Sequence, residues 1–166
     1  GGIMLADIMA KAIEGVGKSK KCRIFTESEF CSICSNEKRD KSNICVVESV
    51  SDVFAIEQSN QFNGNYFILH GHLSPIDDIG PEELALDKLF KLAKSEEVKE
   101  LILATNSTLE GETTSHYIHD YLKDLEGLKL TKLAQGVPLG GELEYVDRGT
   151  IMHAFNGRVE LKDLSE

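Results

Sequence analysis

The sequence contains no tryptophan, only three prolines, and no apolar run near the ~20 residues that a membrane-spanning helix needs. Its first residues also lack the basic-then-apolar pattern of a signal peptide. We therefore expect neither a membrane protein nor a secreted one, and predict a cytoplasmic location. With 166 residues, 41% of them hydrophobic, the chain can bury a core without relying on disulfides or metal.

Basic side chains are also scarce, with 18 Lys and Arg against 28 Asp and Glu and a net charge of −10. The imbalance is uneven, because residues 1–44 carry a net charge of +2 and residues 45–166 one of −12. The long C-terminal part should repel the phosphates of nucleic acids. If the protein works on DNA, we expect the DNA-facing surface elsewhere or in a partner.

The four cysteines are confined to a short part of the chain, and three of them form the pattern Cys22-x8-Cys31-x2-Cys34. In a chain that is not secreted, such a cluster favours metal over disulfide. A closed zinc site needs four ligands, and the position three residues before Cys22 is Ser19. Two interpretations stay open: three thiolates hold zinc with a water or outside ligand, or the cluster is the remnant of a lost site. Cys45 lies in an apolar run and is predicted to be a core residue.

Apolar patterning predicts strands that alternate with helices. The predicted strands are 43–48, 65–69, 99–104 and 129–133, and the predicted helices are 3–16, 50–59, 81–95, 112–124 and 147–156, with 158–161 extended. This order implies an α/β fold with a four-stranded parallel sheet and helices on both faces. A helix and a small loop-rich cysteine module should precede it.

Acidic residues follow two of these strands. Glu48 ends the strand 43–48, and the loop 105–112 follows the strand 99–104. Because functional loops gather at the carboxyl ends of parallel strands, we expect the two to be neighbours in space. Such a cluster is a usual way to hold Mg²⁺. Taken alone, however, it favours a solvated acidic turn with Glu112 at a helix N-terminus.

Three further patterns are weaker. Ala12-x4-Gly17-Lys18-Ser19 fits a relaxed phosphate loop but follows a helix and opens the cysteine module, which argues against nucleotide binding. His70 and His72 could reach one ion but lack a third ligand, so hydrogen-bonded structural roles are favoured. The glycine-rich stretch 136–142 predicts an unusual backbone turn.

Longer stretches carry a family resemblance. They are Cys22 with CSICS at 31–35, ICVVES at 44–49, GHLSP at 71–75, ILATN at 102–106, EGE at 110–112 and GVPLGGELE at 136–144. In this order, the sequence resembles the bacterial recombination mediator family RecR.

The resemblance implies a domain order. It comprises an N-terminal helix (1–17) left from a longer N-terminal region, a zinc-finger-like module (18–42), a Toprim domain (43–135) and a C-terminal assembly segment (136–166). It also implies ring-shaped oligomers that encircle DNA and act with RecO and RecF to load RecA onto gapped single-stranded DNA.

Two departures from the family matter. The basic helix-hairpin-helix that begins family members is absent, so we expect weak or no DNA binding and a dimer, where the full-length protein forms a tetrameric ring. Ser19 stands where the family has its first zinc-binding cysteine, which leaves the zinc in question.

The resemblance also bears on catalysis. Catalytic Toprim proteins carry Asp-x-Asp-x-x-Gly, and Asn106, Thr108 and Gly111 occupy those positions here. An amide and a hydroxyl cannot replace the charge that binds Mg²⁺, so we expect no Mg²⁺ and no enzymatic activity. The alternatives are a Mg²⁺-dependent Toprim nuclease or phosphotransferase, and a fragment that only assembles.

The acidic residues then need another role. A patch of Glu48, Asn106, Glu110 and Glu112 is predicted to dock a basic partner such as RecO. Opposite charges would steer this association, and salt would weaken it.

Overall fold

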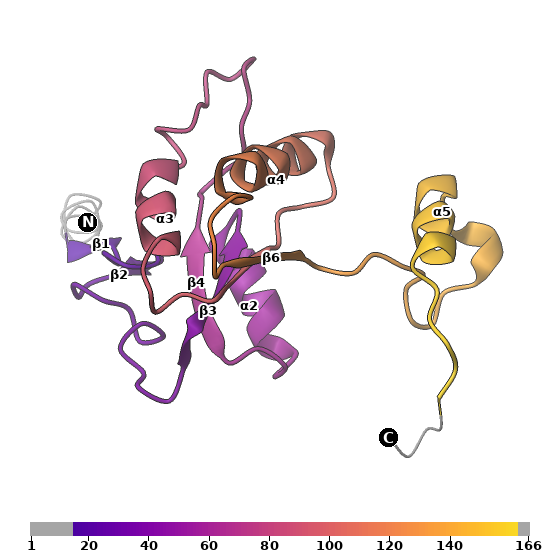
Figure 1. Ribbon diagram of the computed structural model, residues 1–166, viewed down its shortest axis with the longest axis horizontal. Coiled ribbons are helices and arrows are strands. Elements are labelled where there is room, and N and C mark those ends of the chain that lie inside the picture. Colours follow the sequence, from indigo (N-terminus) through magenta and orange to yellow (C-terminus); the bar gives the residue numbers. More distant parts are fainter. Residues whose placement is uncertain (1–14, 163–166) are drawn as a thin grey trace, which may run out of the picture. The chain divides into compact units, whose positions relative to one another are not determined.

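The computed structural model describes residues 15–162, so the helix predicted over 3–16 lies outside the described residues except for its end. The chain divides into two compact units, with the boundary between Lys132 and Leu133. Figure 1 traces the elements of both units. Within the described residues, no helix is long and apolar enough to cross a membrane.

The first unit is built on a four-stranded sheet. Its strands are β3 (Asp40–Val47), β4 (Gly64–Ile68), β5 (Glu100–Leu103) and β6 (Lys129–Lys132). They lie in the order β4-β3-β5-β6, and every neighbouring pair is parallel. The predicted parallel four-stranded sheet is therefore confirmed, with strand ends that differ from the prediction by at most three residues.

The central strand β3 shows why these segments are strands. Its apolar residues from Ile44 to Val47 are all buried, as expected of a parallel strand that is covered on both faces. Successive side chains point to opposite faces of the sheet. Ile44 and Val46 accordingly belong to one core cluster, and Cys45 and Val47 to the other.

Helices cover both faces, as predicted (Figure 1). On one face, α3 (Leu86–Ala93) and α4 (Leu109–Leu122) pack against the sheet through buried side chains such as Leu89 and Ile118. On the other face lie α2 (Val50–Gln58) and the cysteine module. The two faces therefore have different neighbours, and only the α2 face carries the cysteines.

Two predicted helix boundaries are wrong. The helix predicted over 81–95 begins only at Leu86, because Ala85 is in the left-handed conformation with φ of 54° and cannot continue a right-handed helix. The helix predicted to begin at 112 begins at Leu109, because the Thr108 side chain caps it by accepting a hydrogen bond from a backbone N–H.

The cysteine module is joined to the sheet. It contains a short antiparallel pair, β1 (Gly17–Lys18) and β2 (Phe25–Thr26). The backbone N–H of Ile68, at the end of β4, donates to the Cys22 carbonyl over 2.8 Å. The module is therefore part of the first unit, even though its sequence is loop-rich.

The second unit contains a short 3-10 helix, η1 (Leu143–Tyr145), and α5 (Arg148–Asn156), which begins after Asp147 because that side chain accepts from the Thr150 N–H. Residues 158–161 have no regular secondary structure. None of the described residues from 133 to 162 is buried. The exposed large apolar side chains of this second unit include Leu139, Leu143, Tyr145, Phe155, Val159 and Leu161.

Candidate functional site

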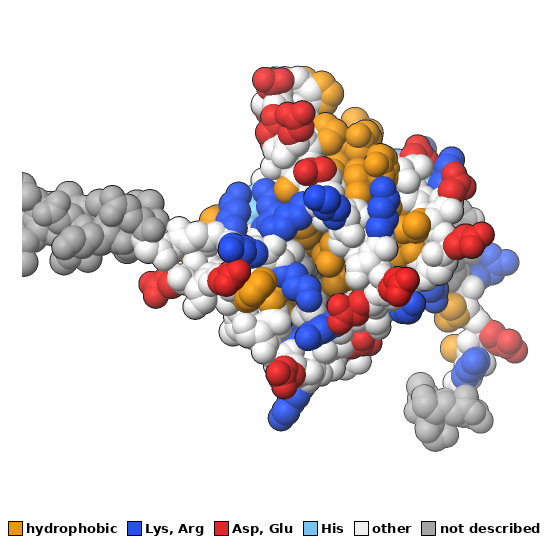
Figure 2. Space-filling model, turned by 60° about the vertical axis from the view of Figure 1, so that its left-hand side comes forward, with side chains coloured by type: hydrophobic (Ala, Val, Ile, Leu, Met, Phe, Trp, Pro, Cys, Tyr) orange, Lys and Arg blue, Asp and Glu red, His pale blue; other side chains and the backbone are white. Residues whose placement is uncertain are grey.

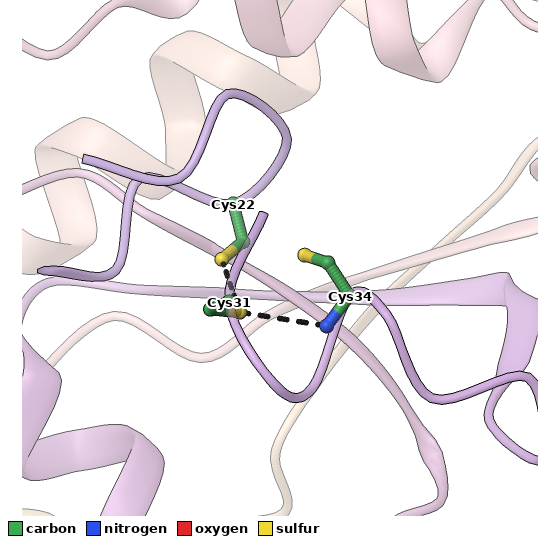
Figure 3. A group of neighbouring side chains, drawn as sticks. All are labelled: Cys22, Cys31 and Cys34. Carbon is green, nitrogen blue, oxygen red and sulfur yellow. Dashed lines mark hydrogen bonds between the residues drawn. The ribbon is translucent and has the colours of Figure 1, made fainter. Parts of the chain in front are cut away.

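Three of the four cysteines meet in one cluster. The sulfur atoms of Cys22, Cys31 and Cys34 all lie within 4.8 Å of one another, and those of Cys22 and Cys31 are 3.4 Å apart (Figure 3). Among the described residues, this is the one group of three or more His, Cys, Asp or Glu side chains whose ligand atoms are close enough to share a metal ion. Cys45 is buried in the core instead, as predicted, where burial raises the pKa of its thiol to about 12.

Local backbone geometry holds the cluster in place. The N–H of Cys34 donates to the Cys31 sulfur over 3.4 Å, and the N–H of Ile24 donates to the Cys22 sulfur over 3.5 Å. Such contacts stabilise a sulfur that carries negative charge. The turn that carries Cys22 and the turn that carries Cys31 and Cys34 thus bring their sulfur atoms close together.

Two of the three thiols, Cys22 and Cys34, have pKa values shifted in opposite directions. The pKa of Cys22 is lowered, chiefly because the Cys34 thiol donates a hydrogen bond to it, with further support from the Ile24 N–H. The pKa of Cys34 is raised, first by that same hydrogen bond and then by burial. The lowered pKa of Cys22 favours its thiolate, which is the form of cysteine that binds metal.

The spacing of the sulfur atoms suits zinc. With Zn–S bonds of about 2.3 Å, two ligands of a tetrahedral ion lie about 3.8 Å apart. The 3.4 Å between Cys22 and Cys31, and the 4.8 Å limit on the whole group, bracket that value. The donor set is thus compatible with a zinc ion held by three sulfurs.

The second candidate site lies at the carboxyl ends of β3 and β5. Glu48 follows β3, and its Oε2 accepts a hydrogen bond from the Asn106 N–H over 2.5 Å. The prediction that Glu48 and the 105–112 loop are neighbours is confirmed. Gly111 allows this approach, because a Cβ there would lie 2.0 Å from the Asn106 carbonyl oxygen and 3.1 Å from Glu48 Oε2.

The two histidines take structural roles, as predicted. His72 Nδ1 lies 3.0 Å from Glu48 Oε1, whereas His70 Nε2 lies 2.6 Å from the Arg23 carbonyl oxygen. They therefore have different hydrogen-bond partners. Burial, and after it the charges of Lys18 and Arg23, lowers the pKa of His70.

The four residues predicted to form an acidic patch face different surroundings. Glu48 is only 5% exposed, and both of its oxygens are engaged by Asn106 and His72. Glu112 is half-buried and forms an ion pair with Lys132 over 2.7 Å. Asn106 and Glu110 are exposed. The surface at this edge is consequently less acidic than the sequence suggests.

The remaining two motifs adopt local structure without phosphate-binding geometry. Gly17 and Lys18 form β1, and Ser19 enters the cysteine turns, so no helix N-terminus follows the glycine-lysine pair. In the glycine-rich stretch, Gly140 has φ of 79° and the Gly141 N–H donates to the Pro138 carbonyl over 3.3 Å. The predicted turn is present there.

Sequence reasoning missed Arg23. Its guanidinium is buried and donates to the carbonyl oxygens of Ile68, Leu69 and Leu84 over 3.0, 3.1 and 2.9 Å. These partners lie more than forty residues away in sequence. No local pattern marks an arginine for this role.

Sequence reasoning also missed a hollow of about 370 Å³ between α3 and α4. Tyr121 lies in it, stacked on Phe90 with ring centroids 3.9 Å apart, and the ammonium of Lys94 is 5.3 Å from the Tyr121 ring.

On the face drawn in Figure 2, Lys and Arg side chains gather beside an apolar strip although the chain is acidic overall. The acidic excess is therefore spread unevenly over the surface.

Comparison with known proteins adds two domain matches. Residues 42–134 match the model of the Toprim domain, and residues 136–159 match the model described as RecR, C-terminal. The first match spans the parallel sheet described above except for the first two residues of β3. The second falls within the second unit.

Relatives that match nearly all of this chain are also found. The chain is 49% identical over 162 residues to the recombination protein RecR of Coxiella burnetii, covering 98% of this chain and 80% of the relative. It is 53% identical over 161 residues to the proteins of the same name from Xylella fastidiosa strain Temecula1 and Xanthomonas campestris pv. campestris strain 8004, covering 97% of this chain and 81% of each relative.

Proposed function

Because the chain belongs to the RecR family of recombination proteins, we propose that it is a non-enzymatic mediator of recombination repair. In this role it is a clamp subunit that docks RecO and RecF and helps to load RecA onto gapped single-stranded DNA. The Toprim domain is then a binding platform. The proposal places the protein in the cytoplasm, as a homo-oligomer.

The observation that carries the non-enzymatic proposal is the state of Glu48. Its Oε2 accepts a hydrogen bond from the Asn106 N–H and its Oε1 contacts His72, so the carboxylate that the Toprim resemblance would assign to Mg²⁺ is already used inside the fold. Thr108 caps α4 by accepting from the Gly111 N–H over 3.0 Å. Mg²⁺ needs several free oxygen ligands, preferably carboxylates. Of the three glutamates predicted at this edge, only Glu110 has an exposed side chain, because Glu48 is buried and Glu112 is half-buried and pairs with Lys132.

A Mg²⁺ titration with supercoiled plasmid tests this directly. We expect no nicking at any Mg²⁺ concentration. Nicking that requires Mg²⁺ and disappears in Glu48→Gln would overturn the proposal in favour of a Toprim nuclease. The Glu126→Gln variant, which changes an exposed glutamate beyond the C-terminus of α4, controls for a contaminating nuclease.

Partner docking is assigned to the loop surface, which we define as Asn106, Leu109 and Glu110. All three side chains are exposed, and Leu109 is 81% exposed. A hollow of about 220 Å³ between α4 and β6, lined in part by Glu112, His116 and Leu130, begins one turn further along α4. An exposed carboxylate beside an apolar side chain suits a basic partner that also buries apolar surface. Glu48 then holds the loop in position and does not itself meet the partner.

Binding of RecO to Glu110→Lys tests the docking proposal. We expect at least about tenfold weaker binding and a shallower salt dependence, because a steering charge is reversed. The matched control is Glu126→Lys, which makes the same charge change beyond the opposite end of α4. Equal RecO binding by both variants would show that RecO docks elsewhere.

We also assign zinc to the three cysteines. The ion would join the two turns that carry Cys22 and the Cys31–Cys34 pair, and so stabilise the module. Plasma mass spectrometry of the purified chain should find about one zinc per chain. A chain without zinc would mean that the module folds by packing alone.

A further inference from the structure

The cysteine module contains a fully buried serine next to the sulfur cluster. Ser19 has no exposed surface. Its Oγ lies 3.8 Å from the Cys34 sulfur, to which it donates, and accepts from the Cys31 N–H over 3.2 Å. Two members of the sulfur cluster are thus hydrogen-bonded to this one hydroxyl.

The backbone gives Ser19 a position equivalent to that of a cysteine. Ser19 and Cys22 are separated by two residues, as are Cys31 and Cys34. The first residue of each pair accepts a hydrogen bond at its carbonyl from the N–H four residues on: from Arg23 to Ser19 over 2.9 Å, and from Ser35 to Cys31 over 3.0 Å. The two turns match, and Ser19 corresponds to Cys31.

The distances then fit a tetrahedral ion. Bonds of about 2.0 Å to oxygen and 2.3 Å to sulfur put an oxygen and a sulfur ligand about 3.5 Å apart. The observed separation of Ser19 Oγ and Cys34 Sγ is 3.8 Å. A small inward movement of the hydroxyl on metal binding would close the difference.

We propose that Ser19 supplies the fourth ligand, so that this chain forms a zinc centre of three sulfurs and one hydroxyl oxygen. The inference rests on the proposed zinc and decides between a ligand from inside the chain and one from outside it. A neutral hydroxyl is a weaker ligand for zinc than a thiolate. The centre should therefore bind zinc more weakly than a four-cysteine site, and a single substitution should restore the stronger site.

Zinc affinity, measured by competition with a chromophoric chelator, tests the assignment. We expect Ser19→Ala to lower the affinity at least about tenfold, and Ser19→Cys to raise it by at least the same factor. Ser28 is exposed in the same module and provides matched controls. Ser28→Ala and Ser28→Cys should leave the affinity unchanged, even though the latter adds a thiol.

Cobalt substitution gives a second readout that counts sulfur ligands directly. The Co²⁺-loaded chain should show the visible bands of a tetrahedral ion together with sulfur-to-cobalt charge transfer. In Ser19→Cys the charge-transfer intensity should rise by about one third, in proportion to the number of thiolates. If Ser19→Ala fails to fold, as circular dichroism would reveal, Ser19→Cys still tests whether position 19 binds the metal.

The possible failures are distinct. Unchanged zinc affinity in a folded Ser19→Ala would overturn the inference in favour of a water or outside ligand, with the zinc itself retained. No rise in charge transfer in Ser19→Cys would show that position 19 is not at the metal. If the unsubstituted chain binds neither zinc nor cobalt, the proposed zinc site falls and the Ser19 assignment falls with it.

Discussion

The guanidinium of Arg23 donates a hydrogen bond to the carbonyl oxygen of Leu84 over 2.9 Å, joining the cysteine module to the segment that precedes α3. The same group also donates to Ile68 and Leu69 at the end of β4. All three acceptors are backbone carbonyl oxygens. Arg23 thus anchors the module to the sheet independently of any metal ion.

Replacing Arg23 by methionine should lower the free energy of unfolding by about 3 kcal/mol, because buried carbonyls would lose their donors at about 1–3 kcal/mol each. Part of that loss is offset by the apolar surface that methionine buries. Urea unfolding followed by circular dichroism measures the change. Lys88→Met, which removes a charge from an exposed position on α3, is the control, and an equal effect of both variants would contradict the anchoring role.

Gly111→Ala should destabilise the protein although alanine favours helices. A Cβ at this position would lie 2.0 Å from the Asn106 carbonyl oxygen, which is backbone and cannot move without breaking the contact with Glu48. Helix propensity alone predicts a gain of about 1 kcal/mol. We expect instead a loss of about 2 kcal/mol, as is typical of overpacking.

The control for Gly111→Ala is Gly136→Ala, where a new Cβ would meet nothing within 4 Å. Thermal unfolding of the three proteins provides the comparison. A Gly111→Ala variant as stable as the starting protein would show that the Asn106 loop can shift at little cost.

Acid should weaken the protein through Glu57. The Arg39 guanidinium pairs with this carboxylate, and the Tyr66 hydroxyl donates to it, so the pKa of Glu57 is lowered from its ordinary value of 4.5. A carboxylate with a lowered folded-state pKa stabilises the fold above the unfolded-state pKa and loses that contribution as pH falls through the folded-state value. The loss should therefore begin near pH 4.5 and continue below it.

Urea unfolding at several pH values on either side of 4.5 tests this dependence. Glu57→Gln, which keeps an acceptor for Tyr66, should have a shallower decline in acid than the starting protein. Glu126→Gln makes the same charge change on an exposed residue and should leave the decline as it was. Parallel declines in all three proteins would show that another group controls acid stability.

Removal of metal should lower the melting temperature. The Cys22 carbonyl accepts from the Ile68 N–H, so loosening the cysteine turns also disturbs the end of β4. A strong chelator should lower the temperature of the main transition, and added zinc should restore it. The Cys34→Ser variant should melt at a lower temperature and respond less to chelator, and an unchanged response would place the metal outside the cluster.

Much of the first unit was predictable because its signals are local. The apolar run at 44–47 and the run at 65–69 marked strands, and both are buried in the structure. Helix α3 was predicted too long because nothing in the sequence shows that Ala85 adopts a left-handed conformation. That conformation depends on how the chain packs after Pro81.

The candidate site was predictable to a smaller degree. Spacing identified the three cysteines, and the order of the strands placed Glu48 near Asn106. The direction in which Glu48 points could not be predicted, because burial depends on neighbours that arrive from other parts of the chain. For the same reason the sequence did not reveal that Lys132 neutralises Glu112.

By itself, the sequence determined the order of strands and helices and the positions of the cysteines. These features depend on residue type and on spacing along the chain. Only the tertiary structure decided which distant groups meet, such as Ser19 with Cys34 and Arg23 with Leu84. Such contacts form because burying the two core clusters brings segments together, and a buried polar group must then be paired with whatever partner lies within reach.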